Sequence, residues 1–154
     1  MSFLPADLYA QIEQSVPLAC VDFVPVQEDR VGLIRRASPF GQVWCHLGGR
    51  ILRGETMAQA LRRHAHDTLA VDLVLPDDPQ PAYVYQWFPP EIMPQDGVAY
   101  GSDPRKQAVG LSFAVEITGT PVAQNEALDF GWFQPGALPA PLWPGSAELL
   151  RRLL

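Results

Sequence analysis

The sequence predicts an α+β domain in which a mixed β-sheet lies between helices, as an α/β/α sandwich. Short apolar runs rich in β-branched and aromatic residues recur along the chain between turn-forming residues, as expected of strands. Helical spacing of apolar residues appears in the middle and at both ends. Hydrophobic residues make up 47% of the 154 residues, which is enough to bury a substantial core.

The first third of the chain predicts one helix followed by strands. Residues 5–15 predict a helix, because Pro5 suits a first helical turn and Leu8 and Ile12 are four residues apart. The segments that follow are apolar, and polar or glycine- and proline-containing turns at 27–30 and 37–42 separate them. The predicted strands are residues 16–26, 31–36 and 43–47.

Residues 56–69 have the strongest helical pattern in the chain. Thr56 followed by Gln59 fits a capping box, in which each residue satisfies a backbone N–H of the other. One apolar stripe is expected to face the core, and it consists of Met57, Leu61, Ala65 and Leu69.

The rest of the chain predicts strands at 82–88, 109–117 and 128–133, and a closing helix at 146–154. The long loop between the first two of these strands is expected to be functional, because long irregular loops are uncommon inside compact domains. Proline-rich residues 135–145 predict a rigid connector. No internal repeat or linker divides the chain, so residues 1–154 are expected to form a single domain.

Charge and cysteine usage exclude several classes of function. A net charge of −6 argues against unspecific binding to nucleic acid or an anionic membrane. The chain lacks a signal-peptide start and a membrane-length apolar run, so a cytoplasmic location is expected. Cys20 and Cys45 lie in apolar runs and are expected to pack as small hydrophobic residues.

Six arginines between positions 35 and 63 suggest one site for a small anionic ligand, although solvated arginines on separate faces would give the same pattern. Within this segment, Gly48-Gly49 predicts a sharp turn that allows close approach to a ligand. On the helix that follows, His66 should face solvent, whereas His64 and Asp67 are three residues apart and able to converge.

The segment "GRILRGETMAQALRRHAHDTLAV", residues 49–71, resembles the Nudix box, G-x5-E-x7-R-E-U-x-E-E-x-G-U, where U is a bulky aliphatic residue. Gly49, Glu55, Arg63 and Val71 keep the spacing of the box without a gap. The box is degenerate, because other residues stand where it has three further glutamates and a last glycine. These residues are His64, Asp67, Thr68 and Ala70.

The flanking segments extend the resemblance over residues 16–138. "VWCHLGGR" resembles the strand and turn before the box, with Leu47 in place of the usual proline. "NEALDFGWF" resembles the acidic strand that presents a further carboxylate, with Glu126 six residues before Trp132. GDP-mannose mannosyl hydrolase is the closest-looking branch, on the residues Val16-Pro17-Leu18, Asp22 and Gly48-Gly49-Arg50. That branch keeps the last box glutamate, which is Thr68 in this chain.

The resemblance implies a Nudix-like sandwich and hydrolysis of a nucleoside diphosphate derivative, such as a nucleotide sugar, with Mg²⁺ or Mn²⁺. It implies metal binding by the Gly49 carbonyl, Asp67 and Glu126, and diphosphate binding by Arg35, Arg36 and Arg50. The candidate catalytic residues are His64, Asp22 and Glu55, with His64 or Asp22 as base toward water. Glu55 could equally brace the loop before the helix. An imidazole at position 64 would favour Mn²⁺ over Mg²⁺.

Two alternatives stay open: a catalytically inactive Nudix-fold module that binds a nucleotide-like ligand, and a structural domain of the same fold. Trp87, Phe88 and Tyr100 could stack a nucleobase or belong to the core. The resemblance, together with an apolar N-terminal segment, predicts a homodimer. The apolar residues of that segment are Phe3, Leu4, Leu8 and Ile12.

Overall fold

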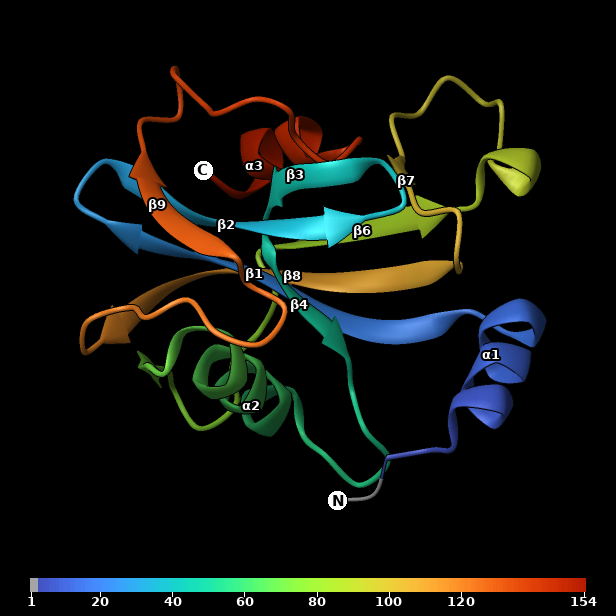
Figure 1. Ribbon diagram of the computed structural model, residues 1–154, viewed down its shortest axis with the longest axis horizontal. Helices are drawn as coiled ribbons and strands as arrows, with labels where there is room; N and C mark the ends of the chain where they lie inside the picture. The colour runs from blue at the N-terminus through green and yellow to red at the C-terminus, as the bar shows by residue number, and fades with distance from the viewer. Residues whose placement is uncertain (1–2) are drawn as a thin grey trace.

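The computed structural model describes residues 3–154 (Figure 1). Within them, nine strands form one sheet with the main order β3-β2-β1-β8-β6-β7; in addition, β4 pairs with β1, β5 with β8 and β9 with β2. The strands are β1 Leu18–Gln27, β2 Arg30–Ser38, β3 Gly41–Cys45, β4 Leu47–Arg50, β5 Asp72–Val74, β6 Tyr83–Phe88, β7 Gly101–Ser102, β8 Ala108–Thr118 and β9 Asp129–Phe133. The helices are α1 Ala6–Ser15, α2 Met57–Leu69 and α3 Ser146–Leu153, with a 3₁₀ turn at Pro90–Ile92.

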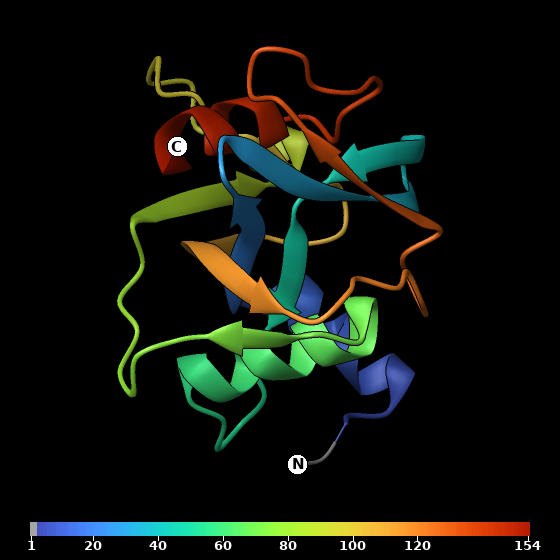
Figure 2. The same cartoon turned by 90° about the vertical axis from the view of Figure 1, so that its left-hand side faces the viewer.

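The predicted α+β sandwich is confirmed. The sheet is mixed, because β1 and β8 pair in parallel at its centre whereas β2, β4 and β6 join antiparallel. Helix α2 packs beside β1, β4 and β5, and α3 packs beside β6, β7 and β8, so the two helices cover opposite sides of the sheet (Figures 1 and 2). Helix α1 lies at the edge of the molecule and buries none of its residues. No helix within residues 3–154 is long and apolar enough to cross a membrane.

The predicted central helix and its cap are confirmed. The Thr56 hydroxyl accepts a hydrogen bond from the Gln59 backbone N–H at 3.1 Å, and the Gln59 side chain accepts one from the Thr56 N–H at 2.9 Å. Leu61 is fully buried, and the side chain of His66 is 80% exposed, as the helical spacing predicts. The buried face of α2 consists of Ala60, Leu61, Ala65, Thr68 and Leu69.

The sharp turn predicted at Gly48-Gly49 is wrong. Both glycines lie inside β4, where they pair with Asp22 and Val21 of β1. Glycine is needed at position 48 because its φ is +136° and an added Cβ would lie 2.0 Å from the Val21 carbonyl oxygen. Gly48 therefore does allow a close approach, but the group that comes close is the backbone of β1 and not a ligand. The predicted strand at 43–47 is also interrupted, because β3 ends at Cys45 and β4 begins at Leu47.

Candidate functional site

A cavity of about 230 Å³ opens between β1, β3, β4, the middle of α2 and the segment that precedes β8. Charged side chains dominate its wall. The cations are Arg36, Arg50, Arg105 and Lys106. The carboxylates are Asp22, Asp103 and Glu126, and His46 and His64 also line the wall. An anionic ligand with several oxygen atoms suits this set.

Asp22, in the middle of β1, is a buried polar group of the cavity and, like Asp103, is 5% exposed. Its Oδ2 accepts a hydrogen bond from Trp87 Nε1 at 3.0 Å, and its Oδ1 lies 3.3 Å from His46 Nε2. Gly110 of β8 makes room for the carboxylate, because a Cβ at that position would lie 2.1 Å from Asp22 Oδ2. The His46 ring is stacked on Trp87 with centroids 5.1 Å apart. Asp22 is thus held by partners, as a buried carboxylate must be.

Two of the cations are held by acids and by one indole ring. Arg36 contacts Glu126 at 2.9 Å, and Arg105 binds Asp103 through two side-chain hydrogen bonds of 3.0 Å. The Asp103 carboxylate raises the pKa of Arg105. Both guanidinium groups also lie over Trp143, at 5.7 and 5.2 Å from the ring centroid. These contacts fix the two cations in place before a ligand arrives.

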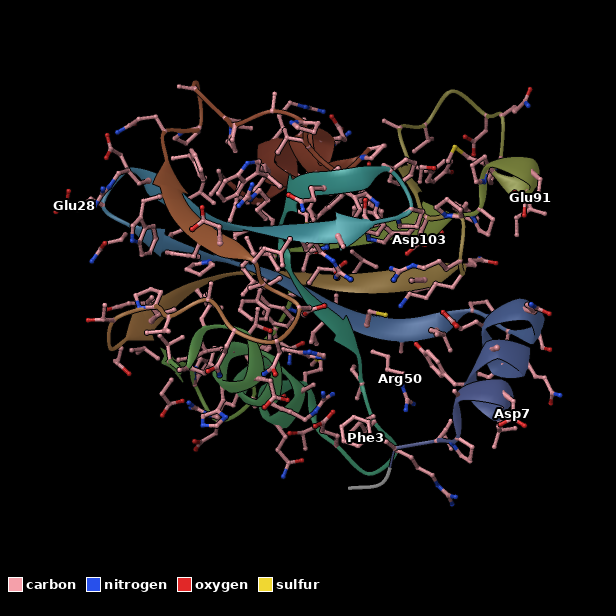
Figure 3. All side chains as sticks on the ribbon, in the orientation of Figure 1. Phe3, Asp7, Glu28, Arg50, Glu91 and Asp103 are labelled. Atoms are coloured by element: carbon pink, nitrogen blue, oxygen red, sulfur yellow. The ribbon has the colours of Figure 1, made fainter. Side chains whose placement is uncertain are left out.

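The other two cations, Arg50 and Lys106, make no ion pair within residues 3–154. Arg50 extends from the end of β4 toward α1 (Figure 3), where its guanidinium lies 4.7 Å from the centroid of the Tyr9 ring. Lys106 lies just before β8 and lines the same cavity. Their positive charge is therefore available to a ligand.

His64 reaches the cavity from α2 and lies under Gly49, where a Cβ would be 2.8 Å from its ring. Its Nε2 lies 3.2 Å from the Arg50 carbonyl oxygen and 3.3 Å from Arg63 Nη2. Burial, and then the charge of Arg63, lower the pKa of His64, so the imidazole is neutral at neutral pH.

Glu55, a predicted catalytic residue, does not line the cavity, and its carboxylate is hydrogen-bonded to neighbouring groups of the protein. Its side chain is 0% exposed, and it accepts hydrogen bonds from Arg63 at 2.7 and 3.0 Å and from the Leu52 N–H at 2.9 Å. Arg63 also donates to the Arg50 carbonyl oxygen at 3.0 Å. These contacts match the bracing interpretation, because they tie the loop before α2 to the helix.

Arg35 and Asp67 also lie outside the set of residues that line the cavity. Successive strand residues face opposite sides of a sheet, so on β2 Arg36 lines the cavity and Arg35 does not. The side chain of Asp67 is 54% exposed and lies 3.6 Å from His66 Nδ1. The predicted convergence of His64 with Asp67 on one point is therefore absent from this arrangement of the described residues.

As placed, the side chains do not fit Mg²⁺ or Mn²⁺. No three His, Cys, Asp or Glu residues within positions 3–154 come close enough together to hold a metal ion. Glu126 is paired with Arg36, Glu55 with Arg63, and Asp22 with Trp87. At the position of the last box glutamate, Thr68 is 2% exposed. Hard cations require several free carboxylate or carbonyl oxygens, which these pairings do not leave.

Sequence reasoning missed several residues that line the cavity, among them His46, Asp103, Arg105, Lys106 and Trp143. Three of them belong to the long loop between β6 and β8, whose length was the only signal for their role. The cysteines, by contrast, behave as predicted. Burial raises the pKa of the Cys20 and Cys45 thiols to about 12, so both are neutral and unsuited to nucleophilic attack.

Two of the predicted aromatic residues belong to the core. Trp87 is 4% exposed and Phe88 is 7% exposed. The Tyr100 ring lies edge-on to Phe88, with centroids 5.1 Å apart, and its hydroxyl donates to Asp96 at 2.8 Å. Of these three residues, Trp87 lines the cavity, where His46 covers one of its faces.

Residues 1–143 match the family described as "Domain of unknown function (DUF4916)". None of the curated proteins matches the sequence. Among solved structures, a possible asymmetric diadenosine tetraphosphate hydrolase from Jonesia denitrificans is 32% identical, with a TM-score of 0.77 over 90% of this chain and 92% of that one.

Two further structures share the fold at lower identity. A MutT Nudix hydrolase from Burkholderia pseudomallei is 20% identical, with a TM-score of 0.72 over 91% of this chain and all of that one. An ADP-ribose pyrophosphatase from Streptococcus suis is 18% identical, with a TM-score of 0.61 over 89% of each chain. The chain belongs to the family described as domain of unknown function DUF4916, and its fold is the one found in Nudix hydrolases.

Proposed function

We propose that this protein hydrolyses a nucleoside diphosphate derivative bound in the cavity. The observation that carries the proposal is the convergence of four cationic side chains on a cavity whose wall also holds a buried Asp–His pair. These cations are Arg36, Arg50, Arg105 and Lys106. Guanidinium groups bind phosphate oxygens through paired hydrogen bonds, and lysine binds them as a point charge.

The four cations divide the work of binding the diphosphate. Arg50 and Lys106, which have no acidic partner within the described residues, take phosphate oxygens directly. Arg36 and Arg105 are oriented by Glu126 and Asp103 and face the same space over Trp143. Charge that develops on a leaving phosphate would be stabilised by this fixed set, because the groups need no reorganisation during the reaction.

The related structures support this class of substrate. Diadenosine tetraphosphate and ADP-ribose, which appear in the names of two of them, both join a nucleoside to another group through linked phosphates. A nucleotide sugar has the same linkage. Three finer points remain predictions: a nucleotide sugar as the substrate, similarity to the GDP-mannose mannosyl hydrolase branch, and the direction of bond cleavage.

Metal use by Gly49, Asp67 and Glu126 also remains a prediction. It would require Glu126 to exchange Arg36 for the cation and Asp67 to turn inward from solvent. The pairing of Glu126 with Arg36 and the exposure of Asp67 favour a second candidate function, a module that binds the nucleotide derivative without cleaving it. Asp67→Asn tests the predicted metal site, because this substitution lowers turnover only if Asp67 holds a metal ion.

The test is a panel of ADP-ribose, diadenosine tetraphosphate and GDP-mannose, each with Mg²⁺, with Mn²⁺ and with a chelator. Released phosphate is measured after phosphatase treatment, released sugar is measured separately, and ligand-induced thermal stabilisation is recorded in parallel. Arg50→Ala should weaken binding roughly 10- to 100-fold, which is the usual effect of losing a charge-assisted hydrogen bond. Arg53→Ala, an exposed arginine of the nearby turn, is the matched control and should change nothing.

Turnover in the wild-type protein that Arg50→Ala weakens supports the hydrolase. Stabilisation by a ligand without turnover under any metal condition supports the binding module. A panel that yields neither stabilisation nor turnover contradicts both functions.

A further inference from the structure

A second cavity, of about 650 Å³, lies between the end of α1, the segment before β1 and the long loop that connects β6 to β8. Arg105 lines both this cavity and the first one. Its neighbours in the chain divide between the two, because Asp103 and Lys106 line the first cavity whereas Pro104 and Gln107 line the second. The two cavities are therefore adjacent, and one short segment forms part of both walls.

Helix α1 forms part of both walls as well. Tyr9 lines the first cavity and Glu13 lines the second, and residues four apart lie on the same face of a helix. The Asp103 carboxylate is the main cause of the raised pKa of Arg105, and Glu13 contributes to it, so Glu13 also lies near this guanidinium. The side chain of Arg105 is 41% exposed, which leaves it open to a ligand where the cavities meet.

The first cavity alone is small for a whole nucleoside diphosphate derivative. Its volume is about 230 Å³, whereas sites that enclose a drug-sized ligand usually measure about 300–1,000 Å³. Its cations suit the diphosphate, which carries the negative charge of such a ligand. The neutral groups joined to the diphosphate need further space, and the second cavity provides it.

The polar part of the second wall suits hydroxyl groups. Its hydrogen-bonding side chains are Glu13, Gln14, Ser15, Glu91 and Gln107. Glu13 and Glu91 make no ion pair within residues 3–154, so their carboxylate oxygens can accept hydrogen bonds from a ligand. Their negative charge would repel a further phosphate group.

The rest of the second wall is apolar but not aromatic. It consists of Val16, Pro17, Pro89, Ile92 and Pro104. No aromatic side chain within the described range 3–154 lines this cavity, whereas proteins commonly bind unpaired nucleobases by stacking them on aromatic rings. A sugar ring matches the mixed wall, because its C–H groups are apolar and its hydroxyl groups donate hydrogen bonds.

We propose that the second cavity binds the sugar that the diphosphate carries, while the first cavity binds the diphosphate itself. The inference rests on the proposed function, in either its hydrolytic or its binding form. Arg105 lies where the two parts of the ligand join. Its Nε and Nη2 donate to Asp103, and its Nη1 makes no hydrogen bond within residues 3–154, which leaves a donor for an oxygen of the nearer phosphate.

Ser15→Trp tests the second cavity by filling it. Ser15 is exposed at the end of α1, so an indole at this position adds bulk to the cavity without disturbing the core. Titration calorimetry with ADP, ADP-ribose, GDP and GDP-mannose, in the presence of a chelator, measures binding. The variant should bind the two sugar-bearing ligands roughly 10-fold more weakly or worse, because the hydrogen bonds of the sugar are lost. The affinity for ADP and GDP should stay unchanged.

Glu91→Gln makes the same comparison without added bulk, and it covers the case in which Ser15→Trp fails to fold. Glu91 is exposed, and loss of its charge should weaken the sugar-bearing ligands by roughly 10-fold. Two exposed residues that line neither cavity give the matched controls, Gln11→Trp on α1 and Glu116→Gln on β8. Both controls should bind all four ligands as the wild-type protein does.

Each outcome bears on the inference. A loss confined to the sugar-bearing ligands in either variant establishes the sugar subsite, and the larger of the ribose and mannose losses identifies the sugar that fits. An equal loss for ADP and ADP-ribose overturns the inference, because the nucleoside then occupies the second cavity. Unchanged binding of all four ligands in both variants also overturns it and leaves the proposed function standing. A wild-type protein that binds none of the four overturns the inference together with the proposed function.

Discussion

Glu55→Gln tests whether the box glutamate braces the fold or takes part in chemistry. The substitution keeps the shape of the side chain and removes its charge, which leaves Arg63 only 12% exposed and without its acidic partner. Removal of one partner from a buried ion pair usually destabilises a protein by about 3–5 kcal/mol. Glutamine keeps an oxygen for the Leu52 N–H, so the lower end, about 3 kcal/mol, is expected. In a domain of this size that corresponds to a fall in Tm of about 6–12 °C.

Urea unfolding at 25 °C, followed by tryptophan fluorescence, measures this free energy. The partner variant Arg63→Met and the double variant complete a double-mutant cycle, in which a coupling energy of at least about 1 kcal/mol is expected. Asp72→Asn is the matched control, because its ion pair with Arg62 lies at the surface, where the Asp72 side chain is 69% exposed. Its effect should be small compared with that of Glu55→Gln, because an exposed ion pair contributes little to stability.

The effect of Glu55→Gln should also depend on pH. Hydrogen bonds from Arg63 lower the pKa of Glu55 from its usual 4.5. A carboxylate with a lowered pKa in the folded state contributes stability that is fully present above the unfolded value and is lost as pH falls through the folded value. The difference between wild type and Glu55→Gln should therefore shrink as the pH drops below 4.5.

Two results would refute the bracing role. One is a destabilisation below about 1 kcal/mol at neutral pH, which is the range of an exposed pair. The other is a folded Glu55→Gln protein, assayed well below its Tm, whose kcat has fallen 100-fold or more while its stability is unchanged. The second result would restore the catalytic role predicted from the box.

Three further predictions concern folding, the cavity and assembly. Leu61→Asp should prevent folding, because Leu61 is 0% exposed and an unpaired charge cannot be accommodated there; a far-UV circular dichroism melt like that of wild type would contradict this. Gly110→Ala should displace Asp22 and destabilise the protein by about 1–3 kcal/mol in urea, whereas Gly136→Ala, which meets no atom within 4 Å, should be neutral. The protein should form a homodimer, because α1 buries none of its residues and its Leu8 is 42% exposed. Light scattering should then give twice the 17.0 kDa mass of one chain, and a single 17.0 kDa species at micromolar concentration would contradict the prediction.

The sequence alone was sufficient where the signal was local. The capping box and apolar stripe located α2 within one residue of its start, because both depend on residues three or four positions apart. Alternating and apolar runs located the longer strands for the same reason. Strands β5 and β7 escaped prediction because they contain three and two residues, too few for a pattern to repeat.

Only the tertiary structure determined which residues come together in the site. Asp22 could be singled out from sequence because a lone carboxylate in an apolar strand needs a partner. The identity of its partners could not, because Trp87 is 65 residues away and reaches Asp22 only through the pairing of β1 and β6 with β8. Arg105 and Lys106 had no pattern to mark them, since an irregular loop carries them to the cavity. Spacing along α2 placed Asp67 beside the predicted site, but in the folded protein its carboxylate is exposed to solvent. The position of a residue around a helix does not determine how that helix packs against the rest of the fold.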